Sequence, residues 1–179
     1  MAGIKTYSIS KFYQKDDRAS VENITEALSH FKCKFDNEDL ERFLKEKAIE
    51  FEERNLTRTY LVCDTPDRLE GYFSIGLKSI ALDHVSKKFK RVIASDDRVN
   101  NAHVFLIAHI GASAGSKLEK YQLLRSAVQY IRKAQVLVGG RAIYLDCDKE
   151  NERLIKYYET FGFTVIDEDE HYKNMIIKI

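Results

Sequence analysis

Residues 103–117 read HVFLIAHIGASAGSK, and this stretch decides the fold that the sequence predicts. Its first eight residues, 103–110, form the most apolar run of the chain, which is typical of a central strand buried on both faces. A loop of small residues follows, and an amphipathic pattern then predicts a helix over 118–134. A buried strand, a loop and a helix in this order are the first parts of a right-handed β–α–β crossover.

The second half of the crossover follows the Gly139-Gly140 turn. Residues 142–147 (AIYLDC) predict another buried strand, and a helix then carries Leu154, Ile155 and Tyr158 on one face. Gly162 suits the left-handed residue that ends such a helix. Two last strands, 164–167 and 172–179, are expected to form a hairpin.

Upstream, β-branched and aromatic residues predict a hairpin of strands 57–63 and 70–82 around a turn at 64–67, where Pro66 fixes φ. An edge strand is expected near 5–10. Ser20 with Asn23 resembles a capping box for a first helix, and Asp36 or Asn37 can cap a second helix. That second helix has an apolar stripe consisting of Leu40, Phe43, Leu44, Ala48 and Phe51. Residues 86–93 are expected to be a loop or a short helix.

These elements predict a single α/β domain over 1–179 with a mixed sheet. The 179 residues include 44% hydrophobic and 32% charged residues, enough apolar surface for a sizeable core. The 29 basic and 28 acidic residues nearly balance, which argues against a dedicated nucleic-acid coat but leaves room for a local patch.

The three cysteines, Cys33, Cys63 and Cys147, are too few and too scattered for a disulfide framework or a zinc site. No stretch reaches the roughly 18 apolar residues of a membrane span, and residues 1–17 lack the apolar region of a secretory signal. We therefore expect a cytoplasmic protein with reduced thiols, no metal and no membrane contact.

The loop after the buried strand is the first candidate for chemistry. A strand that feeds a small-residue turn and then a helix offers backbone N–H groups to an anion, and Lys117 and Lys120 add positive charge. Many α/β proteins have such loops without a ligand. The loop is neither GxxxxGK[ST] nor GxGxxG, so the residues do not favour a nucleoside triphosphate or a dinucleotide.

Residues 151–163 (NERLIKYYETFGF) add specificity. They resemble the GNAT N-acetyltransferase superfamily, whose members carry an Asn, a helix with an aromatic–Tyr pair, and Gly-Phe before a strand. Here these positions are Asn151, Tyr157, Tyr158, Gly162 and Phe163. The resemblance extends from about residue 57 to the end. Stretches 35–48, 57–62 and 71–75 also look like acetyltransferases of toxin–antitoxin modules and their mobile-element relatives.

The resemblance implies a mostly antiparallel mixed sheet with a splayed central strand pair and flanking helices, and acetyl-CoA as co-substrate between strands 103–112 and 142–147. Main-chain groups of Ile110 and Ala112, together with Asn151 and Tyr158, are expected to contact the cofactor. The family's Q/R-x-x-G-x-G/A loop is absent, since residues 115–120 read GSKLEK. Gly111, Gly115 and Ser116 are then expected to approach the pyrophosphate closely, with Lys117 and Lys120 offsetting its charge.

In such an enzyme a primary amine attacks the thioester directly. By its place in the motif, Tyr158 is the expected acid for the leaving thiolate, although a core role is open to it. Glu70 and His109 are candidate bases, and His109 is also read as a core histidine. An α-amino acceptor with a pKa near 8 needs no protein base. The oxyanion is expected near the N–H of Ile110 or Gly111.

Several acceptors and partners are consistent with the resemblance. The acceptor is the α-amino group of aminoacyl-tRNA, or a protein or small-molecule amine. Lys87, Lys88, Lys90 and Arg91 form either a solvated face or an RNA contact. An antitoxin-like protein partner and a homodimer are further expectations. The competing hypothesis is a non-catalytic GNAT-fold interaction module that has lost cofactor binding, which the glycine-poor loop keeps open.

Overall fold

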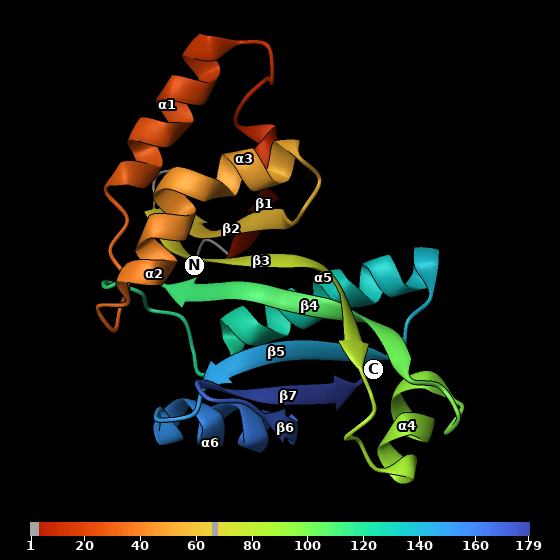
Figure 1. The fold of residues 1–179 in the computed structure, drawn as a ribbon. Helices are drawn as coiled ribbons and strands as arrows, with labels where there is room; N and C mark the ends of the chain where they lie inside the picture. Colours follow the sequence, from red (N-terminus) through yellow and green to blue (C-terminus); the bar gives the residue numbers. More distant parts are fainter. Residues whose placement is uncertain (1–3, 66–67) are drawn as a thin grey trace. The chain divides into compact units, whose positions relative to one another are not determined.

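The stretch that decides the fold lies in strand β4 (Asn101–Ala112) and in the loop that leads from it to helix α5 (Gln122–Val138) (Figure 1). The computed structural model describes residues 4–65 and 68–179. β4 extends two residues beyond the predicted strand at each end, and its middle is buried, as expected. The helix begins four residues later than predicted, because Tyr121 has a φ of 67°, which no α-helix accommodates.

The described residues form two units. The first contains the described residues up to Gly76 together with His109–Ala127, and the second contains Leu77–Ala108 with Val128–Ile179. Strands β3 (Arg68–Ala81) and β4 contribute to both units, and so does α5. The expectation of one domain over 1–179 stays a prediction.

The first unit contains an antiparallel hairpin of β2 (Arg58–Thr65) and β3, with β1 (Lys5–Ser8) paired to β2 at the edge. The predicted edge strand and hairpin are thus confirmed. Pro66 and Asp67 of the predicted turn lie outside the described residues. Gly71 is required where β3 approaches β4, because a Cβ there would lie 2.7 Å from the carbonyl oxygen of Gly111.

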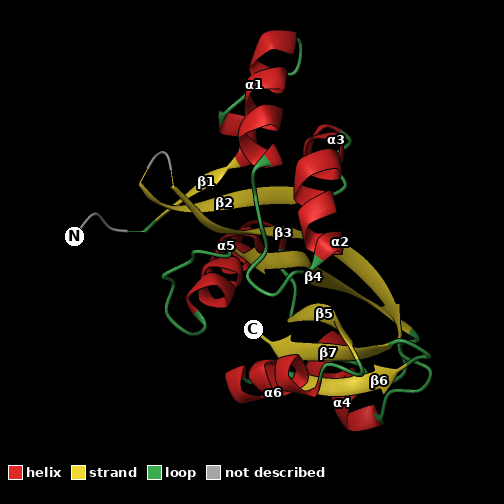
Figure 2. Cartoon of the chain, turned by 90° about the vertical axis from the view of Figure 1, so that its left-hand side faces the viewer, coloured by secondary structure: helices red, strands yellow, loops and turns green. Residues whose placement is uncertain are grey.

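The helices of the first unit gather on the β1–β2 side (Figures 1 and 2). They are η1 (Ile9–Lys11), α1 (Arg18–Ser29), α2 (Glu38–Arg42), the π-helical η2 (Phe43–Lys47) and α3 (Ala48–Glu53). Phe43, Leu44 and Ala48 of the predicted stripe are buried, and they pack with residues of α1 and β3 in one core.

The first helix corrects the predicted capping box. Asp17 is the N-cap residue, and its side chain accepts a hydrogen bond from the amide of Ala19 at 3.1 Å. Ser20 lies inside the helix, where its hydroxyl donates to the carbonyl oxygen of Asp17 at 2.9 Å. An Asp three residues upstream thus takes the position that the sequence pattern assigned to Ser20. The second predicted cap is confirmed, since Asn37 accepts from the amide of Leu40 at 3.0 Å.

The second unit contains β5 (Ala142–Asp148), β6 (Thr164–Glu168) and β7 (Tyr172–Lys178), with α6 (Glu152–Phe161) beside β6 and β7 (Figure 2). Residues 86–93 fall in a short helix, α4 (Lys87–Ala94), rather than in a loop. Gly162 ends α6 with a φ of 120°, as predicted. The core of the second unit includes Ile80, Leu82, Val104 and Tyr144.

The strand order is β1-β2-β3-β4-β5-β7-β6. β4 and β5 are parallel, whereas the pairs β1–β2, β2–β3, β5–β7 and β6–β7 are antiparallel. The fold is therefore the predicted α/β class with a mixed, mostly antiparallel sheet. Among the described residues, no helix has the length and apolar character that crossing a membrane requires.

The central strands β4 and β5 part after a short contact. Their pairing consists of Phe105 with Ile143 and Leu106 with Tyr144. Beyond Tyr144, β5 continues to Asp148 with β7 as its described partner, while β4 continues to Ala112. Within the second unit this pairing ends at Leu106 and Tyr144, as the predicted splayed pair requires.

Candidate active site

In the loop between β4 and α5, backbone N–H groups donate hydrogen bonds to acceptors of the chain itself. Four consecutive N–H groups donate to acceptors within the chain, and these acceptors are a carbonyl, a carboxylate, a hydroxyl and a side-chain amide. The pairs are Ser116 to the Ser113 carbonyl at 2.9 Å, Lys117 to Glu70 at 2.6 Å, Leu118 to the Ser116 hydroxyl at 3.2 Å, and Glu119 to the Gln122 side chain at 3.0 Å. An anion at this loop would therefore compete with groups of the protein itself.

Glu70 of β3 is the centre of this arrangement. Its side chain is only 1% exposed, and its Oε1 lies 2.7 Å from Nε of Arg68. The Oε2 atom accepts the amide of Lys117, and the main-chain oxygen of Glu70 accepts the amide of Ser113 at 2.9 Å. Arg68 in turn donates from Nη2 to the carbonyl oxygen of Gly115 at 3.0 Å. The two residues of β3 thus hold the loop at three points.

The connector between α1 and α2 covers the other edge of β4. Lys34 donates its amide to the carbonyl oxygen of Ala112 at 2.8 Å, and Ala114 donates to the carbonyl oxygen of Lys32 at 2.8 Å. Ser113 faces β3, and alternate residues of a strand face opposite edges. Ala112 and Ala114 therefore face the edge away from β3, and so does Ile110.

This alternation divides the predicted main-chain contacts. Ile110 faces the outer edge, where the resemblance expects a cofactor arm to pair. The carbonyl of Ala112 is already bonded to Lys34, so any pairing there would rest on its N–H. Gly111 faces β3, which favours Ile110 over Gly111 as the donor near an oxyanion.

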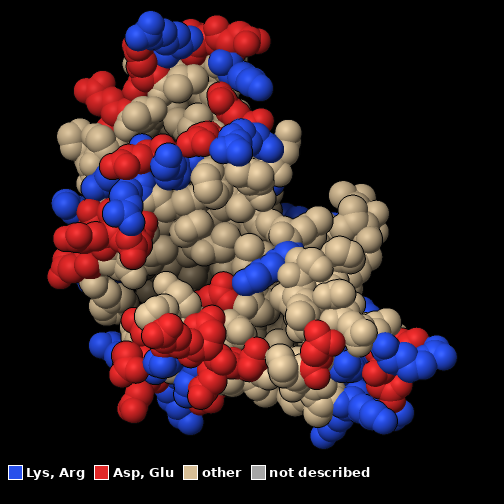
Figure 3. All heavy atoms as spheres, viewed as in Figure 1, with Lys and Arg blue, Asp and Glu red and all other residues tan. Residues whose placement is uncertain are grey.

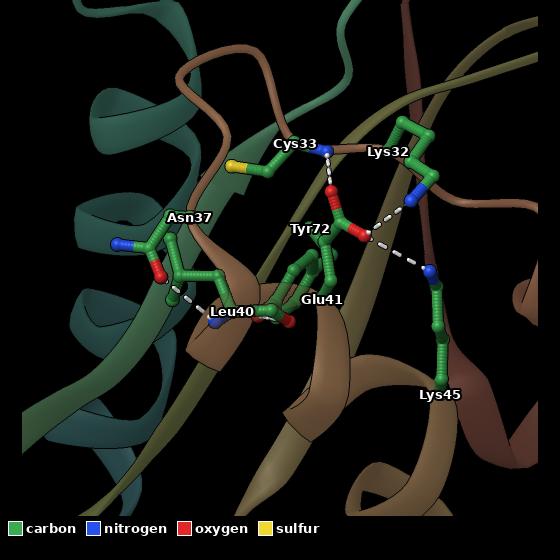
Figure 4. A network of polar contacts seen from close by, with 7 residues as sticks. All are labelled: Lys32, Cys33, Asn37, Leu40, Glu41, Lys45 and Tyr72. Atoms are coloured by element: carbon green, nitrogen blue, oxygen red, sulfur yellow. Dashed lines mark hydrogen bonds and ion pairs between the residues drawn. The ribbon is translucent and has the colours of Figure 1, made fainter.

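Glu41 of α2 fixes the connector (Figure 4). Its carboxylate accepts the amide of Cys33 at 2.9 Å and lies 3.1 Å from Nζ of Lys32 and 3.0 Å from Nζ of Lys45. The hydrogen bond from Cys33, followed by that from Lys45, lowers the pKa of Glu41 to about 2. In the same view, Tyr72 of β3 donates its hydroxyl to the carbonyl oxygen of Leu40 at 2.7 Å. Helix α2 is therefore tied to the sheet and to the connector.

From the sequence, His109 is either a base or a core histidine, and the structure favours the core histidine. Its ring stacks on Phe43 in the π-helical segment, with centroids 3.5 Å apart and planes 12° apart. Burial lowers its pKa to about 4, so the ring is neutral at pH 7. Its Nδ1 atom is buried and has no hydrogen-bond partner among the described residues. A base that protonates only near pH 4 is a weak one for an ammonium acceptor.

In the second unit, Asn151 is the N-cap residue of α6. Its side-chain oxygen accepts the amide of Leu154 at 3.0 Å, while the residue itself is exposed. The predicted contact of Asn151 with a cofactor arm stays a prediction. The cap gives the motif asparagine a structural task in addition, because it starts the helix that carries the tyrosine pair.

Tyr158 lies on the buried side of α6. It is 5% exposed, and its ring packs edge-on against Phe163 and Tyr157 at centroid distances of 5.7 and 5.4 Å. Burial, with a smaller contribution from Cys147, raises the pKa of Tyr158 above its usual value. The phenol keeps its proton at neutral pH, as a proton donor must.

The structure thus places the predicted residues in two sets. Glu70 lies with the loop in the first unit, together with Ile110, Gly111, Ala112, Gly115, Ser116, Lys117 and Lys120, whereas Asn151 and Tyr158 belong to the second unit. Lys117 and Lys120 are exposed, and Nζ of Lys120 lies 4.8 Å from the ring centroid of Tyr121. Among the described residues, no group of three or more His, Cys, Asp or Glu side chains could hold a metal ion.

Sequence reasoning missed Arg68 and the connector 32–34. Arg68 had a signal, because it stands two residues from Glu70 on the same strand and so shares its face. The connector had none, because its partners lie about 80 residues away.

No protein-family model matches the chain. Solved structures do match it. AtaT in complex with acetyl-methionyl-tRNAfMet is 17% identical, with 98% of this chain and 95% of that chain covered and a TM-score of 0.72. A Tyr-to-Phe variant of KacT is 17% identical, with 98% and 94% covered and a TM-score of 0.72. A Tyr-to-Phe variant of the toxin AtaT, bound to the C-terminus of the antitoxin AtaR and acetyl-CoA, is 15% identical, with 98% and 92% covered and a TM-score of 0.67.

The chain has a GNAT-like fold. The loop after β4 differs from a glycine-rich phosphate-binding loop, because four of its amides are hydrogen-bonded within the chain and Glu70 supplies one of the acceptors. Exposed Lys117 and Lys120 are the groups there that can meet phosphate from solvent.

Proposed function

We propose that the chain is an N-acetyltransferase that uses acetyl-CoA to acetylate a primary amine, with the α-amino group of an aminoacyl-tRNA as acceptor. The parting of β4 and β5 carries the proposal, because it leaves strand edges for a thioester arm. The acceptor is supported by the likeness to AtaT, which was solved with acetyl-methionyl-tRNAfMet.

In the proposed mechanism, bound acetyl-CoA supplies an activated acetyl thioester. Main-chain groups of Ile110 hold the pantetheine arm, and Asn151 contacts the same arm. Lys117 and Lys120 lie near the phosphates, and the small residues Gly115 and Ser116 leave room for a close approach there. Tyr158, which is protonated at neutral pH because burial raises its pKa, is the proposed donor of a proton to the leaving sulfur.

The base is a separate part of the proposal. Glu70 was predicted for this role, but its carboxylate is engaged with Arg68 and with the amide of Lys117. An α-amino group is partly neutral near pH 8, so we propose that water takes its proton. A Glu70→Gln variant tests whether Glu70 is the base or only holds Arg68 and the Lys117 amide. Loss of a base lowers kcat at a saturating concentration of acetyl-CoA.

The experiment is transfer of labelled acetyl from acetyl-CoA to a mixture of aminoacylated tRNAs. Label on the aminoacyl group supports the acceptor. Label on protein or polyamine alone would replace tRNA by another amine and keep the enzyme class. No transfer and no binding at millimolar acetyl-CoA would overturn the proposal.

The basic helix α4 is the proposed RNA contact. Figure 3 shows Lys and Arg side chains over α4 at the lower right, with acidic ones among them. Arg91 is paired with Asp97 at 2.6 Å, so the exposed Lys87 and Lys88 and the half-buried Lys90 carry the positive charge. Replacing these three lysines by Gln should weaken tRNA binding and flatten its dependence on salt.

A matched control for this test changes three exposed lysines of the first unit, Lys5, Lys11 and Lys15, to Gln. Both triple variants lose the same net charge. Equal weakening by the two variants would reduce the effect to net charge and remove α4 as the contact.

The loop after β4 favours a second function, because its amides at residues 116–119 are already hydrogen-bonded within the chain. If the chain binds neither the thioester arm nor the nucleotide of acetyl-CoA, it is an interaction module with a GNAT-like fold. AtaT was solved with the C-terminus of its antitoxin AtaR, and an antitoxin-like partner remains a prediction for this chain. Calorimetry with acetyl-CoA decides between the two functions, because the module would show no heat at millimolar ligand.

A further inference from the structure

We propose that this chain recognises its acyl donor through the pantetheine thioester arm, and that the nucleotide diphosphate of CoA adds little to binding. The reason is that the loop after β4 already holds an internal anion, the carboxylate of Glu70. This inference rests on the proposed acetyltransferase function and specifies the donor of that reaction.

The loop amides are already hydrogen-bonded within the chain. A loop before a helix binds phosphate by offering N–H groups that have no other acceptor. Here the amides of residues 116–119 all have acceptors in the chain, at 2.6 to 3.2 Å. A diphosphate must break these bonds before it gains its own, so the exchange yields little net affinity.

The charge of Glu70 also disfavours a diphosphate at this loop. Glu70 lies on the inner side of the loop, 1% exposed, and it accepts the amide of Lys117 at 2.6 Å. A diphosphate brought to that amide would approach a buried carboxylate, and like charges repel strongly away from water. Arg68 offsets part of this charge, but its guanidinium is held by Glu70 and by the carbonyl of Gly115 and so is not free to turn toward a diphosphate.

The loop is also held at both edges of β4. Ser113 is bonded to β3 and Ala114 to Lys32 of the connector, while Glu41 holds the connector in turn. Opening the loop for a diphosphate would therefore break main-chain bonds to two separate segments. An induced rearrangement is costly here.

The groups that remain suit an arm rather than a nucleotide. Ile110 presents its main chain at the edge away from β3, which is how an extended amide-containing chain is bound. The exposed Lys117 and Lys120 can meet a single phosphate without entering the loop. The donor class is thus a phosphopantetheine thioester, of which acetyl-CoA is one member.

The test is calorimetry of the full chain with acetyl-CoA, acetyl-phosphopantetheine and 3′-phosphoadenosine 5′-diphosphate. We expect the dissociation constants of the two thioesters to differ by less than about tenfold, and the free nucleotide to bind at least about tenfold more weakly than either. Acetyl-CoA binding tenfold or more tightly than acetyl-phosphopantetheine would overturn the inference and leave the acetyltransferase proposal intact. If neither thioester binds, both fail.

A variant of the internal anion gives a second readout. Glu70→Gln removes the charge and keeps an acceptor for the Lys117 amide, and it releases the guanidinium of Arg68. The preference for acetyl-CoA over acetyl-phosphopantetheine should then rise about threefold or more. Because this is a ratio of two affinities in one variant, a general loss of stability does not produce it. An unchanged ratio would show that Glu70 does not exclude the diphosphate.

The chain contains a matched control in Glu52. This carboxylate is 5% exposed, accepts the amide of Thr59 at 2.9 Å and pairs with Arg58 at 3.3 Å, so it repeats the Glu70 arrangement at another place in the first unit. Glu52→Gln should lower the melting temperature comparably without changing the ratio. A similar rise in the ratio in this control would overturn the assignment to Glu70.

Discussion

His109 shows how one residue couples packing to pH. Burial against Phe43 lowers its pKa from 6.5 to about 4, so the folded chain stays unprotonated where the unfolded chain takes up a proton. Stability is then fully present above about pH 6.5 and falls as the pH drops toward 4.

Between pH 7 and pH 4, we expect the free energy of unfolding of the parent chain, measured with urea, to fall by on the order of 2 kcal/mol more than that of the His109→Gln variant. His171 is exposed, so His171→Gln serves as the control and should follow the parent chain. Parallel curves for the parent and His109→Gln would contradict the buried, neutral state of His109.

Tyr158 offers a second test at this scale. If it protonates the leaving sulfur, Tyr158→Phe should lower turnover about 100-fold with acetyl-CoA affinity unchanged within about twofold. Tyr157→Phe is the control, because the two rings pack edge-on at 5.4 Å. Equal turnover in the parent and Tyr158→Phe would remove Tyr158 from the mechanism, whereas a parallel loss of affinity would assign it to packing.

At the scale of elements, the connector 32–34 depends on Glu41 of α2. Because its pKa is about 2 in the folded chain, Glu41 contributes stability that is present above its ordinary pKa of 4.5 and is lost as the pH falls from 4.5 toward 2. The Glu41→Gln variant should therefore be less stable than the parent at pH 7, and the two should converge near pH 2.

Denaturation at a series of pH values measures this convergence. Glu38→Gln is the control, since Glu38 is exposed in the first turn of the same helix. A pH-independent difference between Glu41→Gln and the parent would mean that the hydrogen bonds of Glu41 do not require its charge.

Elements also show what the sequence could predict. The strands of the hairpin and β5 were predicted within about two residues, because β-branched and aromatic runs report burial directly. Helix starts were less predictable: Asp17 rather than Ser20 caps α1, and the backbone at Tyr121 delays α5. Caps depend on which of several suitable side chains the rest of the structure orients toward the free amides.

The candidate site was predictable in its residue types and not in its contacts. The motif placed Asn151 and Tyr158 on one helix, and the composition of residues 111–117 predicted a loop of small residues. Nothing local could show that Glu70 binds an amide 47 positions away, or that Lys34 pairs with Ala112. Long-range pairing of this kind is decided by tertiary structure.

At the scale of the whole molecule, ligand binding should be visible as stability. A ligand that binds only the folded chain stabilises it by about 2.7 kcal/mol at a concentration 100 times its dissociation constant. We expect acetyl-CoA to raise the melting temperature by several degrees at saturation, and 3′-phosphoadenosine 5′-diphosphate at the same concentration to raise it far less. The measurement is differential scanning fluorimetry, and a flat response to millimolar acetyl-CoA would contradict the prediction.

The pairing of the connector with β4 has a consequence for solubility. An exposed strand edge is a template on which the strand of another molecule can add, and long bare edges lead to aggregation. The amide of Lys34 donates to the carbonyl oxygen of Ala112, and the carbonyl oxygen of Lys32 accepts the amide of Ala114. The connector therefore shields the end of β4 from such neighbours. The stretch of β4 edge that stays uncovered is thereby kept short, which limits intermolecular β-pairing at this end of the strand.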